Sequence, residues 1–331
     1  MTSKLMLGKE IEVSDVTYRL TKKLGNGGFG YVFLAKVTPA AHCTRQLPME
    51  VAVKIEHSSQ LSRPQLEYEK RVYHTILRKM RSENMVRIPM IYNFVEESPL
   101  PSYKALVMER MSHNLMELFE SYQKDVDNGI REKPFAARDV YLVFSQALDC
   151  LQAIHECGFV HRDIKPENFC VRGDDNNTLC IVDFGLCKRY VYKDGSHIRF
   201  KQNKNLLGTP RYMSLNCHDG YELARRDDVE SLLYMVLFFL NPRLPWQNLK
   251  IDKCSNSKQR KKKKYAKIAK LKRSTSDSGS LFHNAPPPFR AIYNDIRGMA
   301  FEQEPAYASI KRAVRTSLLK ADYSARKRRL R

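Results

Sequence analysis

The sequence predicts an α+β fold in which strands come first and helices follow. Stretches rich in β-branched and aromatic residues lie before residue 109, and stretches with apolar residues at helical spacing dominate after residue 114. The chain has 331 residues, of which 43% are hydrophobic and 28% charged, so it can bury a substantial core. This length suits one large two-lobed domain or two small domains.

Composition narrows the expected surroundings and partners. The net charge of +21 implies attraction to anions, namely nucleic acid, acidic membrane or acidic protein. None of the eight cysteines forms a C-x-x-C pair, so we expect free thiols in a reducing compartment, the cytoplasm and/or the nucleus. Residues Met1–Glu10 lack the apolar core of a signal peptide, and the longest apolar run, Leu232–Leu240, is too short to span a membrane.

A glycine-rich turn lies between two predicted strands near the N-terminus. After a lead-in over residues 1–15, strands are predicted at Val16–Leu24 and Tyr31–Ala35. Glycines let backbone amides approach phosphate oxygens without a Cβ in the way. In a dinucleotide-binding fold a helix would follow the turn, so the strand that follows here favours a loop that covers nucleotide phosphates. The residues of this loop are Gly25, Asn26, Gly27, Gly28, Phe29 and Gly30.

A lysine stands inside the next predicted strand, Val51–Ile55. Burying Lys54 there would be costly unless an acid paired with it, although an edge strand would leave the same lysine on the surface. The helix predicted over Pro64–Met80 offers two acids, Glu67 and Glu69, which point about 200° apart around its axis. The two acids therefore cannot both face the same strand.

The middle of the chain connects the predicted strands to the predicted helices. Tyr103–Met108 is an apolar strand, and its last residue could pack in the core, stand at the back of a pocket, or both. Helices are predicted at Asn114–Tyr122 and Ala137–Cys157. The charged segment 123–134 between them is predicted to be a loop insertion.

One stretch, His161–Phe169, brings an acid, a cation and an amide close together, and Asp183 follows it in an Asp-Phe-Gly triplet. Asp163 can accept the proton of a hydroxyl nucleophile, whereas Asn168 and Asp183 supply the hard oxygen ligands that Mg²⁺ prefers. Lys165 can offset charge on a moving phosphoryl group. Either motif alone would mean little, since a surface His-Arg-Asp is usually a solvated turn, but both in this order indicate phosphoryl transfer.

Two basic stretches follow. Segment 188–211 is either a solvated loop or a site that selects acidic or phosphorylated peptides. Segment 250–273, which includes the tetrad Lys261–Lys264, is either a solvated loop or a patch for nuclear import or polyanion contact. Few aromatic residues interleave with it, so stacking on single-stranded bases is not expected. The chain is predicted to close with two helices and a basic tail, at residues 285–297, 306–321 and 323–331.

The motif H-R-D-x-x-x-x-N at His161–Asn168, followed by D-F-G, is the signature of protein kinases. Lys204–Asn216 lacks the Ala-Pro-Glu expected after most kinase activation loops. Together with Arg225–Leu232 and Leu244–Gln247, it resembles the casein kinase 1 group, whose members carry Ser-Ile-Asn at that place. Tau-tubulin kinases are near relatives within this group. The resemblance covers most of the chain in collinear order.

This resemblance implies a bilobal kinase fold, with a small β-rich N-lobe and a larger helical C-lobe. The kinase domain would occupy residues 16–322, with the N-lobe at about 16–108, the hinge at 109–111 and the C-lobe at 112–322. The family uses ATP and Mg²⁺, modifies serine or threonine in proteins, and needs no phosphorylation of its activation loop. We expect a monomer without a membrane span.

The resemblance also assigns roles to single residues. Asp163 and Lys165 would be catalytic, Asn168 and Asp183 would hold the metal, and Asp228 would anchor the catalytic-loop backbone. Lys54 would orient the ATP phosphates and pair with Glu69, because Pro-Gln-Leu-x-Tyr-Glu resembles the corresponding helix of the family. Further contacts to ATP would come from Val32, Ala52, Met108, Glu109, Met111, Cys170 and Val182. A basic site for an acid or phosphate upstream of the target serine would comprise Lys204, Arg211 and Lys264.

The chain departs from the family pattern near this anion site, where Asn248 replaces a glycine. The segments at 38–49, 123–134 and 250–265 are also longer than usual. These departures concern the preference for primed substrates rather than the chemistry. Two alternatives remain, a pseudokinase scaffold and a kinase-folded protein that binds nucleic acid. A pseudokinase would be expected to have lost Lys54, Asp163 or Asp183, and all three are present.

Overall fold

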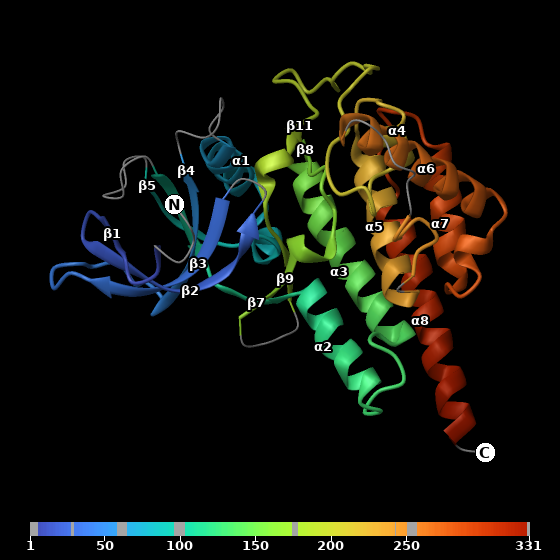
Figure 1. The fold of residues 1–331 in the computed structure, drawn as a ribbon, viewed down its shortest axis with the longest axis horizontal. Coiled ribbons are helices and arrows are strands. Elements are labelled where there is room, and N and C mark those ends of the chain that lie inside the picture. The colour runs from blue at the N-terminus through green and yellow to red at the C-terminus, as the bar shows by residue number, and fades with distance from the viewer. Residues whose placement is uncertain are drawn as a thin grey trace. The chain divides into compact units, whose positions relative to one another are not determined.

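The computed structural model describes residues 6–27, 30–57, 65–95, 103–173, 178–241, 243–249 and 257–329. The chain divides into two compact units (Figure 1). The first comprises Met1–His113 with Cys170–Gly185, and the second comprises Asn114–Phe169 with Leu186–Arg331. Most strands belong to the first unit and most helices to the second, which confirms the predicted α+β class.

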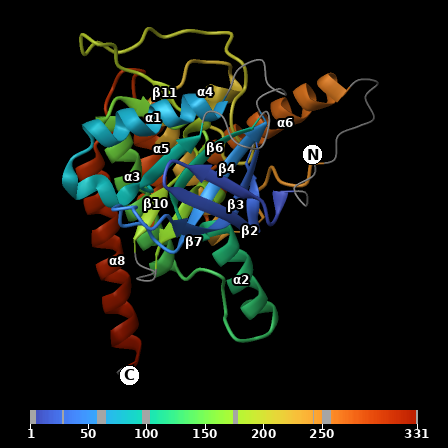
Figure 2. The same ribbon diagram turned by 90° about the vertical axis from the view of Figure 1, so that its left-hand side faces the viewer.

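The first unit is built on a six-stranded antiparallel sheet with the order β1-β2-β3-β4-β6-β5 (Figure 2). Side chains alternate between its two faces, as the period of a strand requires. Val51, Val53 and Ile55 of β4 enter a hydrophobic core, whereas Ala52 and Lys54 lie on the other face. The strands are β1 Glu10–Val13, β2 Val16–Gly27, β3 Gly30–Pro39, β4 Glu50–His57, β5 Ile91–Val95 and β6 Tyr103–Glu109.

The sheet begins earlier than the sequence predicted. Strand β1 lies inside the expected lead-in over residues 1–15 and pairs with β2 from Glu10↔Arg19 to Val13↔Val16. Met6 and Ile11 are 2% and 0% exposed and belong to the core of the sheet. The strand is too short to show a clear alternation in sequence, and it is the sheet that supplies its partners.

Helix α1, Gln65–Lys79, follows β4 and buries an apolar face, as its helical spacing predicted. A 3₁₀ turn at Ser82–Arg87 leads into β5. Two smaller sheets complete the strands. One has the order β10-β9-β7, and the other pairs β11 with β8. Their bounds are β7 Met111–Asn114, β8 Phe159–Val160, β9 Phe169–Arg172, β10 Leu179–Ile181 and β11 Lys188–Arg189.

The second unit is helical and is organised around α5, which is buried along almost its whole length. Helix α3 packs against both α5 and α8, and the three run side by side in Figure 1. Gly158 follows α3 with φ +87°, which ends that helix in a left-handed residue. The helices are α2 Leu115–Asp127, α3 Ala137–Glu156, α4 Leu215–His218, α5 Arg225–Leu240, α6 Ser257–Asp277, α7 Pro287–Gly298 and α8 Tyr307–Arg329.

Two helices run further than predicted. Helix α2 continues through Asp127, so the first part of the expected loop 123–134 is helical; Gln123 donates to Asp127 at 2.9 Å across one turn. The expected basic tail at 323–331 is helical through Arg329, as part of α8.

The basic stretch 250–273 is not a loop from Ser257 onward, because α6 covers that part. Residues 250–256 lie outside the described residues. Lysine favours helices, and Ile268, Ala269 and Leu271 give the second half of α6 an apolar contact surface. Within the described part of the chain, no helix has the length and apolar character needed to cross a membrane. The seven described cysteines form no disulfide with one another.

Candidate active site

A buried lysine in the first unit is held by two acids from other elements. Lys54, on β4, is 6% exposed. Its ammonium donates to Glu69 Oε2 at 2.6 Å and to Asp183 Oδ1 at 2.9 Å. Glu67 instead pairs with Lys104 at 2.9 Å. Of the two acids that α1 offers, Glu69 is therefore the partner, as the family resemblance implied.

The environment of Lys54 keeps its ammonium charged. Burial alone would lower its pKa, because desolvation disfavours a charged group. The attraction of Glu69 and Asp183 outweighs burial and raises the pKa above its ordinary value. A charged ammonium in a fixed position is suited to holding phosphate oxygens.

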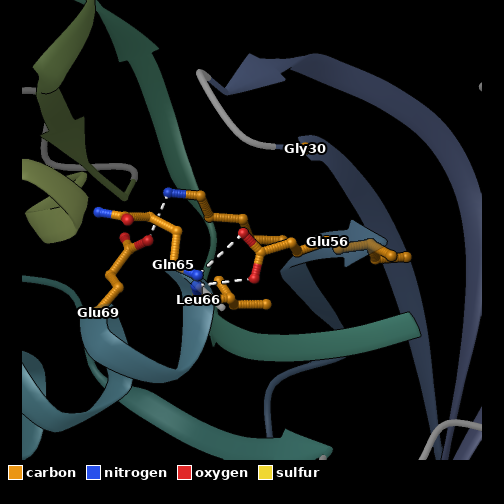
Figure 3. A pocket seen from close by; sticks show the side chains of 7 residues that line it. Gly30, Glu56, Gln65, Leu66 and Glu69 are labelled. Atoms are coloured by element: carbon orange, nitrogen blue, oxygen red, sulfur yellow. Dashed lines mark hydrogen bonds and ion pairs between the residues drawn. The ribbon is translucent and has the colours of Figure 1, made fainter. Parts of the chain in front are cut away.

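A glutamate that lies on the same face of β4 as Lys54 fixes the start of α1. Glu56, two residues after Lys54, is 2% exposed. Its carboxylate accepts hydrogen bonds from the backbone N–H groups of Gln65 at 3.2 Å and Leu66 at 2.9 Å (Figure 3). A carboxylate at this place satisfies amides that have no partner within the helix, and it complements the helix dipole. The strand that carries the lysine thus also positions the helix that carries its partner.

The glycine turn forms the hairpin between β2 and β3. Gly27 pairs with Gly30, whereas the predicted phosphate contacts Gly28 and Phe29 lie outside the described residues. A Cβ on Gly30 would collide with the backbone oxygen of Ile55, so close packing between neighbouring strands requires glycine there. Gly30 also lines a small pocket with residues of β4 and α1 (Figure 3): Lys54, Ile55, Glu56, Gln65, Leu66 and Glu69.

Several predicted ATP contacts share one face of the sheet. Val32 pairs with Gly25 on one side and with Lys54 on the other, and Ala52 pairs with Met108. Met108 is 7% exposed and packs in the interior, which is one of the two roles expected for it. A Cβ on Gly25 would meet no atom within 4 Å, which leaves the backbone open to approach. The remaining predicted contacts lie at strand ends or within β9: Asn26, Glu109, Met111, Cys170 and Val182.

The Asp-Phe-Gly triplet has an unusual backbone. Asp183 has φ +66°, a conformation uncommon for residues other than glycine and often found at functional sites. Phe184 is buried and packs edge-on against Tyr73 of α1, with ring centroids 4.6 Å apart. The carbonyl of Gly185 accepts a hydrogen bond from the Gln65 side chain. Contacts with α1 therefore hold the triplet in this conformation.

In the second unit, the catalytic loop surrounds Asp163 with donors. Lys165 donates to Asp163 Oδ2 at 2.6 Å, and the hydroxyl of Thr209 donates to Oδ1 at 3.0 Å. The amide nitrogen of Asn168 donates to the Asp163 carbonyl at 2.9 Å. Asp163 is 7% exposed, so each contact also limits its rotation. The structure thus brings together the predicted catalytic acid, its lysine and the amide.

Asp228 of α5 anchors the backbone of this loop, as the resemblance implied. Its carboxylate accepts from the N–H groups of His161 at 2.7 Å and Arg162 at 2.8 Å, and it contacts His155 Nε2 at 2.9 Å. Burial acts to raise the pKa of Asp228, but these contacts outweigh it and lower the pKa. Arg162 has φ +70°, and the two bonds support this strained backbone. His161 is fully buried, and its Nδ1 accepts from the N–H of Asp163, which suits a structural residue.

The 209–216 segment, which contains Thr209, is fixed by a lysine from α6. Lys272 is fully buried, and its nitrogen donates to the carbonyls of Pro210 at 3.1 Å and Met213 at 2.5 Å. Its charge also lies over the rings of two aromatic residues, at 4.4 and 5.2 Å from their centroids. Burial lowers the pKa of Lys272 to about 7, although nearby Glu230 acts in the opposite direction.

Two further elements hold the same segment. The indole nitrogen of Trp246 donates to the carbonyl of Arg211 at 2.9 Å. Glu230 of α5 accepts from the N–H of Leu215 at 2.8 Å and pairs with Arg297 of α7 at 3.0 Å. The backbone of this segment is therefore fixed by three side chains of the helical unit, Lys272, Trp246 and Glu230.

The three residues of the predicted anion site have different surroundings. Lys204 pairs with the buried Glu222 at 3.3 Å, and Lys188 pairs with the same carboxylate at 2.8 Å. Arg211 lies over two aromatic rings. Lys264 is exposed on α6. Two ammonium groups on one carboxylate leave one positive charge in excess at this place.

Sequence reasoning missed several positioning residues. Glu56, Thr209, Glu222 and Lys272 were not assigned roles. A signal for Lys272 was present, because it continues the buried face of α6 at helical spacing from Tyr265, Ile268 and Ala269. Glu56 and Glu222 gave no comparable signal, since the groups they bind lie on other elements.

Each unit, taken by itself, contains donor groups of the kind that bind a nucleotide or a hard metal ion. Asp183, in the first unit, presents a carboxylate. Asn168, in the second, directs its amide nitrogen to Asp163 and so turns its oxygen away from that residue. Magnesium is usually bound by one or two protein oxygens together with substrate phosphates. The charged Lys54 and the open backbone at Gly25 suit phosphate oxygens.

A comparison with models of known protein families supports this interpretation. The model described as "Protein kinase domain" matches residues 18–309, which is most of the chain. The match begins within β2 and ends within α8, so it includes the lysine network, the catalytic loop and the 209–216 segment.

Proposed function

Because the chain belongs to the protein kinase family, we propose that it is an active kinase that transfers the γ-phosphate of ATP to serine or threonine in proteins. Two complete groups of charged and polar side chains support this proposal. Lys54 is paired with Glu69 and Asp183, and Asp163 is surrounded by Lys165, Asn168 and Thr209. A scaffold that had lost activity would not need to retain both.

Each residue has a role that follows from its contacts. Asp163 orients the substrate hydroxyl and accepts its proton, because Lys165 and Thr209 fix the carboxylate. Lys165 also offsets negative charge that develops beside it. Lys54 would hold the α- and β-phosphates of ATP, and Asn168 and Asp183 would hold Mg²⁺, which when bound would neutralise charge on the phosphates.

We further propose that the chain belongs to the casein kinase 1 group and favours acidic or phosphate-primed substrates. Asn248 supports the assignment, since it has φ +53° where the group has glycine. Asparagine is among the few residues that tolerate this conformation, so the substitution preserves the local backbone. The residual positive charge near Lys204, with Arg211 and Lys264, supports the preference for acidic sites.

The test is phosphate transfer from ATP·Mg²⁺ to three matched peptides: an unprimed serine peptide, one with upstream acids and one with an upstream phosphoserine. We expect transfer to favour the acidic or phosphorylated peptide and to disappear in Asp163→Asn. Full activity of that variant would show that Asp163 is not the proton acceptor. Absence of transfer, self-phosphorylation and ATP binding together would favour the scaffold.

A further inference from the structure

Helix α6 carries a dense set of cations on its exposed surface. We call Arg260–Lys270 the basic arm. Its exposed cations are Arg260, Lys261, Lys262, Lys263, Lys264, Lys267 and Lys270. No acid occurs in α6 before Asp277, so no carboxylate of the same helix lies among these charges. The arm thus has a strongly positive surface along successive turns.

This arrangement is unfavourable for an isolated helix. Like charges three or four residues apart repel one another, and cations near a helix N-terminus oppose its dipole. The contact described for the tetrad is Lys261 over the ring of Tyr265, at 5.6 Å. An anionic ligand along the arm would relieve both effects.

The other half of α6 fixes the arm beside the 209–216 segment. Ile268, Ala269 and Lys272 are buried, and Lys272 donates to two carbonyls of that segment. Tyr265 packs edge-on against His218 of α4, with centroids 6.4 Å apart. The C-terminal end of the arm therefore lies near the 209–216 segment, and the arm extends away from it. This segment contains Thr209, whose hydroxyl donates to Asp163.

We propose that the basic arm binds an acidic tract of the protein substrate, at a distance from the residue that is phosphorylated. This inference rests on the proposed function and specifies its substrate class. A helix rises about 1.5 Å per residue, so Lys264 and Lys261 lie about 12 Å and about 16.5 Å along the axis from Lys272. An acidic tract that reaches the arm would thus lie beyond the upstream position read by Arg211.

Attachment of the arm to the 209–216 segment favours a peptide over nucleic acid. A protein substrate that reaches Asp163 would come close to α6, because Lys272 binds the segment that contains Thr209, whereas this position gives nucleic acid no advantage over another basic surface. Tyr265 is the one aromatic residue within the arm, which gives little opportunity for base stacking.

The first experiment compares KM for two peptides with the same phosphorylation site. One peptide carries an added tract of Asp and Glu, and the other carries a Gly-Ser tract of equal length. The arm variant is Lys261→Gln, Lys262→Gln and Lys263→Gln; Lys264 is left intact because it belongs to the proposed anion site. The matched control neutralises three exposed cations of the sheet, Arg19→Gln, Lys22→Gln and Lys36→Gln.

Wild type and the control should show a KM roughly three- to tenfold lower for the acidic peptide, and the arm variant should lose that difference, as expected for a few exposed ion pairs. The effect should shrink as salt is raised, and kcat should change little. An arm variant that retained the full advantage of the acidic peptide would overturn the proposal.

A binding measurement separates this inference from the proposed function. Fluorescence anisotropy with the acidic peptide, its target serine replaced by alanine, requires no catalysis. Arm-dependent binding in a protein that showed no transfer, no self-phosphorylation and no ATP binding would support docking and refute the proposed activity. If the protein transferred phosphate but the arm variant bound the peptide as tightly as wild type, docking would be refuted and the proposed activity would stand. If a single-stranded oligonucleotide of equal charge bound the arm more tightly than the peptide did, and the KM values were unchanged in the arm variant, the surface would be a nucleic-acid site.

Discussion

Glu67 and Glu69 show that the position of an acid on a helix determines which lysine it pairs with. Both are acids of α1, yet one pairs with Lys104 at the surface and the other with buried Lys54. Their angular separation could be derived from the sequence, and it restricts the lysine to one of them. Which of the two faces β4 depends on where α1 begins, and periodicity alone could not settle this.

These two glutamates form a matched pair for mutation. We expect Glu69→Gln to lower kcat/KM for ATP by roughly 10- to 100-fold, because the ammonium of Lys54 would lose a charged partner and its fixed position. Glu67→Gln should remain within about twofold of wild type, since an exposed ion pair contributes little. Steady-state kinetics with varied ATP test this. Equal losses in both variants would contradict the assignment.

Lys272 should make stability depend on pH. Its folded pKa of about 7 lies below its unfolded value, so between about pH 7 and pH 10 the unfolded chain binds more protons. The free energy of unfolding contributed by this residue therefore rises with pH across that window, by at most about 1.4 kcal/mol per unit. Below pH 7 the full cost of burying the charge is present.

The test is denaturant unfolding of wild type and Lys272→Met at several pH values from 6.5 to about 9.5. Methionine keeps much of the side-chain volume and removes both the charge and the donor. The stability of wild type relative to the variant should increase as the pH rises. A difference that stayed constant with pH would show that Lys272 does not titrate in this range.

At the scale of elements, α1 depends on a group from another element. Glu56 of β4 supplies the carboxylate at its N-terminus, and α1 in turn carries Glu69. We expect Glu56→Ala to cost about 0.5–2 kcal/mol of stability, as loss of a helix cap does, and to raise KM for ATP. Glu56→Gln keeps an acceptor and should lie between this variant and wild type. Thermal unfolding and ATP kinetics measured on all three proteins provide the check. If Glu56→Ala matched wild type in both, the carboxylate would not position the helix.

The elements that sequence predicted well are those with a clear hydrophobic period. Strand β4 alternates between core and opposite face, and α1 and α3 bury apolar stripes. Helix α6 was missed because its first half is charged on all sides and has no stripe to detect. Strand β1 was missed because its four residues are too few to show a clear alternation of apolar and polar side chains.

For the whole molecule, the kinase family could be predicted from the order of the motifs, whereas the contacts that support these motifs could not. The charged groups of the catalytic motifs could be assigned from their order in the chain. Groups that support them, such as Trp246 and Lys272, lie far along the sequence and bind backbone carbonyls, so the side chains near those carbonyls show no pattern that reveals the contact. Contacts of this kind become visible only in the folded chain.

Net charge should govern stability at this scale. A chain with a charge of +21 repels itself when compact, and salt screens that repulsion over about 10 Å at 0.1 M. We expect the melting temperature to rise between 20 and about 300 mM sodium chloride. The variant with Lys261, Lys262 and Lys263 changed to Gln should show a smaller rise, because it removes adjacent like charges. Calorimetry at matched buffer concentrations measures both, and a melting temperature that fell with salt would mean that attractive pairs dominate.

Glu222 places a lasting negative charge between two cations of one segment. Its buried carboxylate joins Lys188, near the start of the segment after the Asp-Phe-Gly triplet, to Lys204, further along it. The two attractions outweigh burial and lower the pKa of Glu222, so the negative charge persists. Many signalling switches place a phosphate where two such cations meet. Here a glutamate of the chain itself supplies the negative charge between the two lysines.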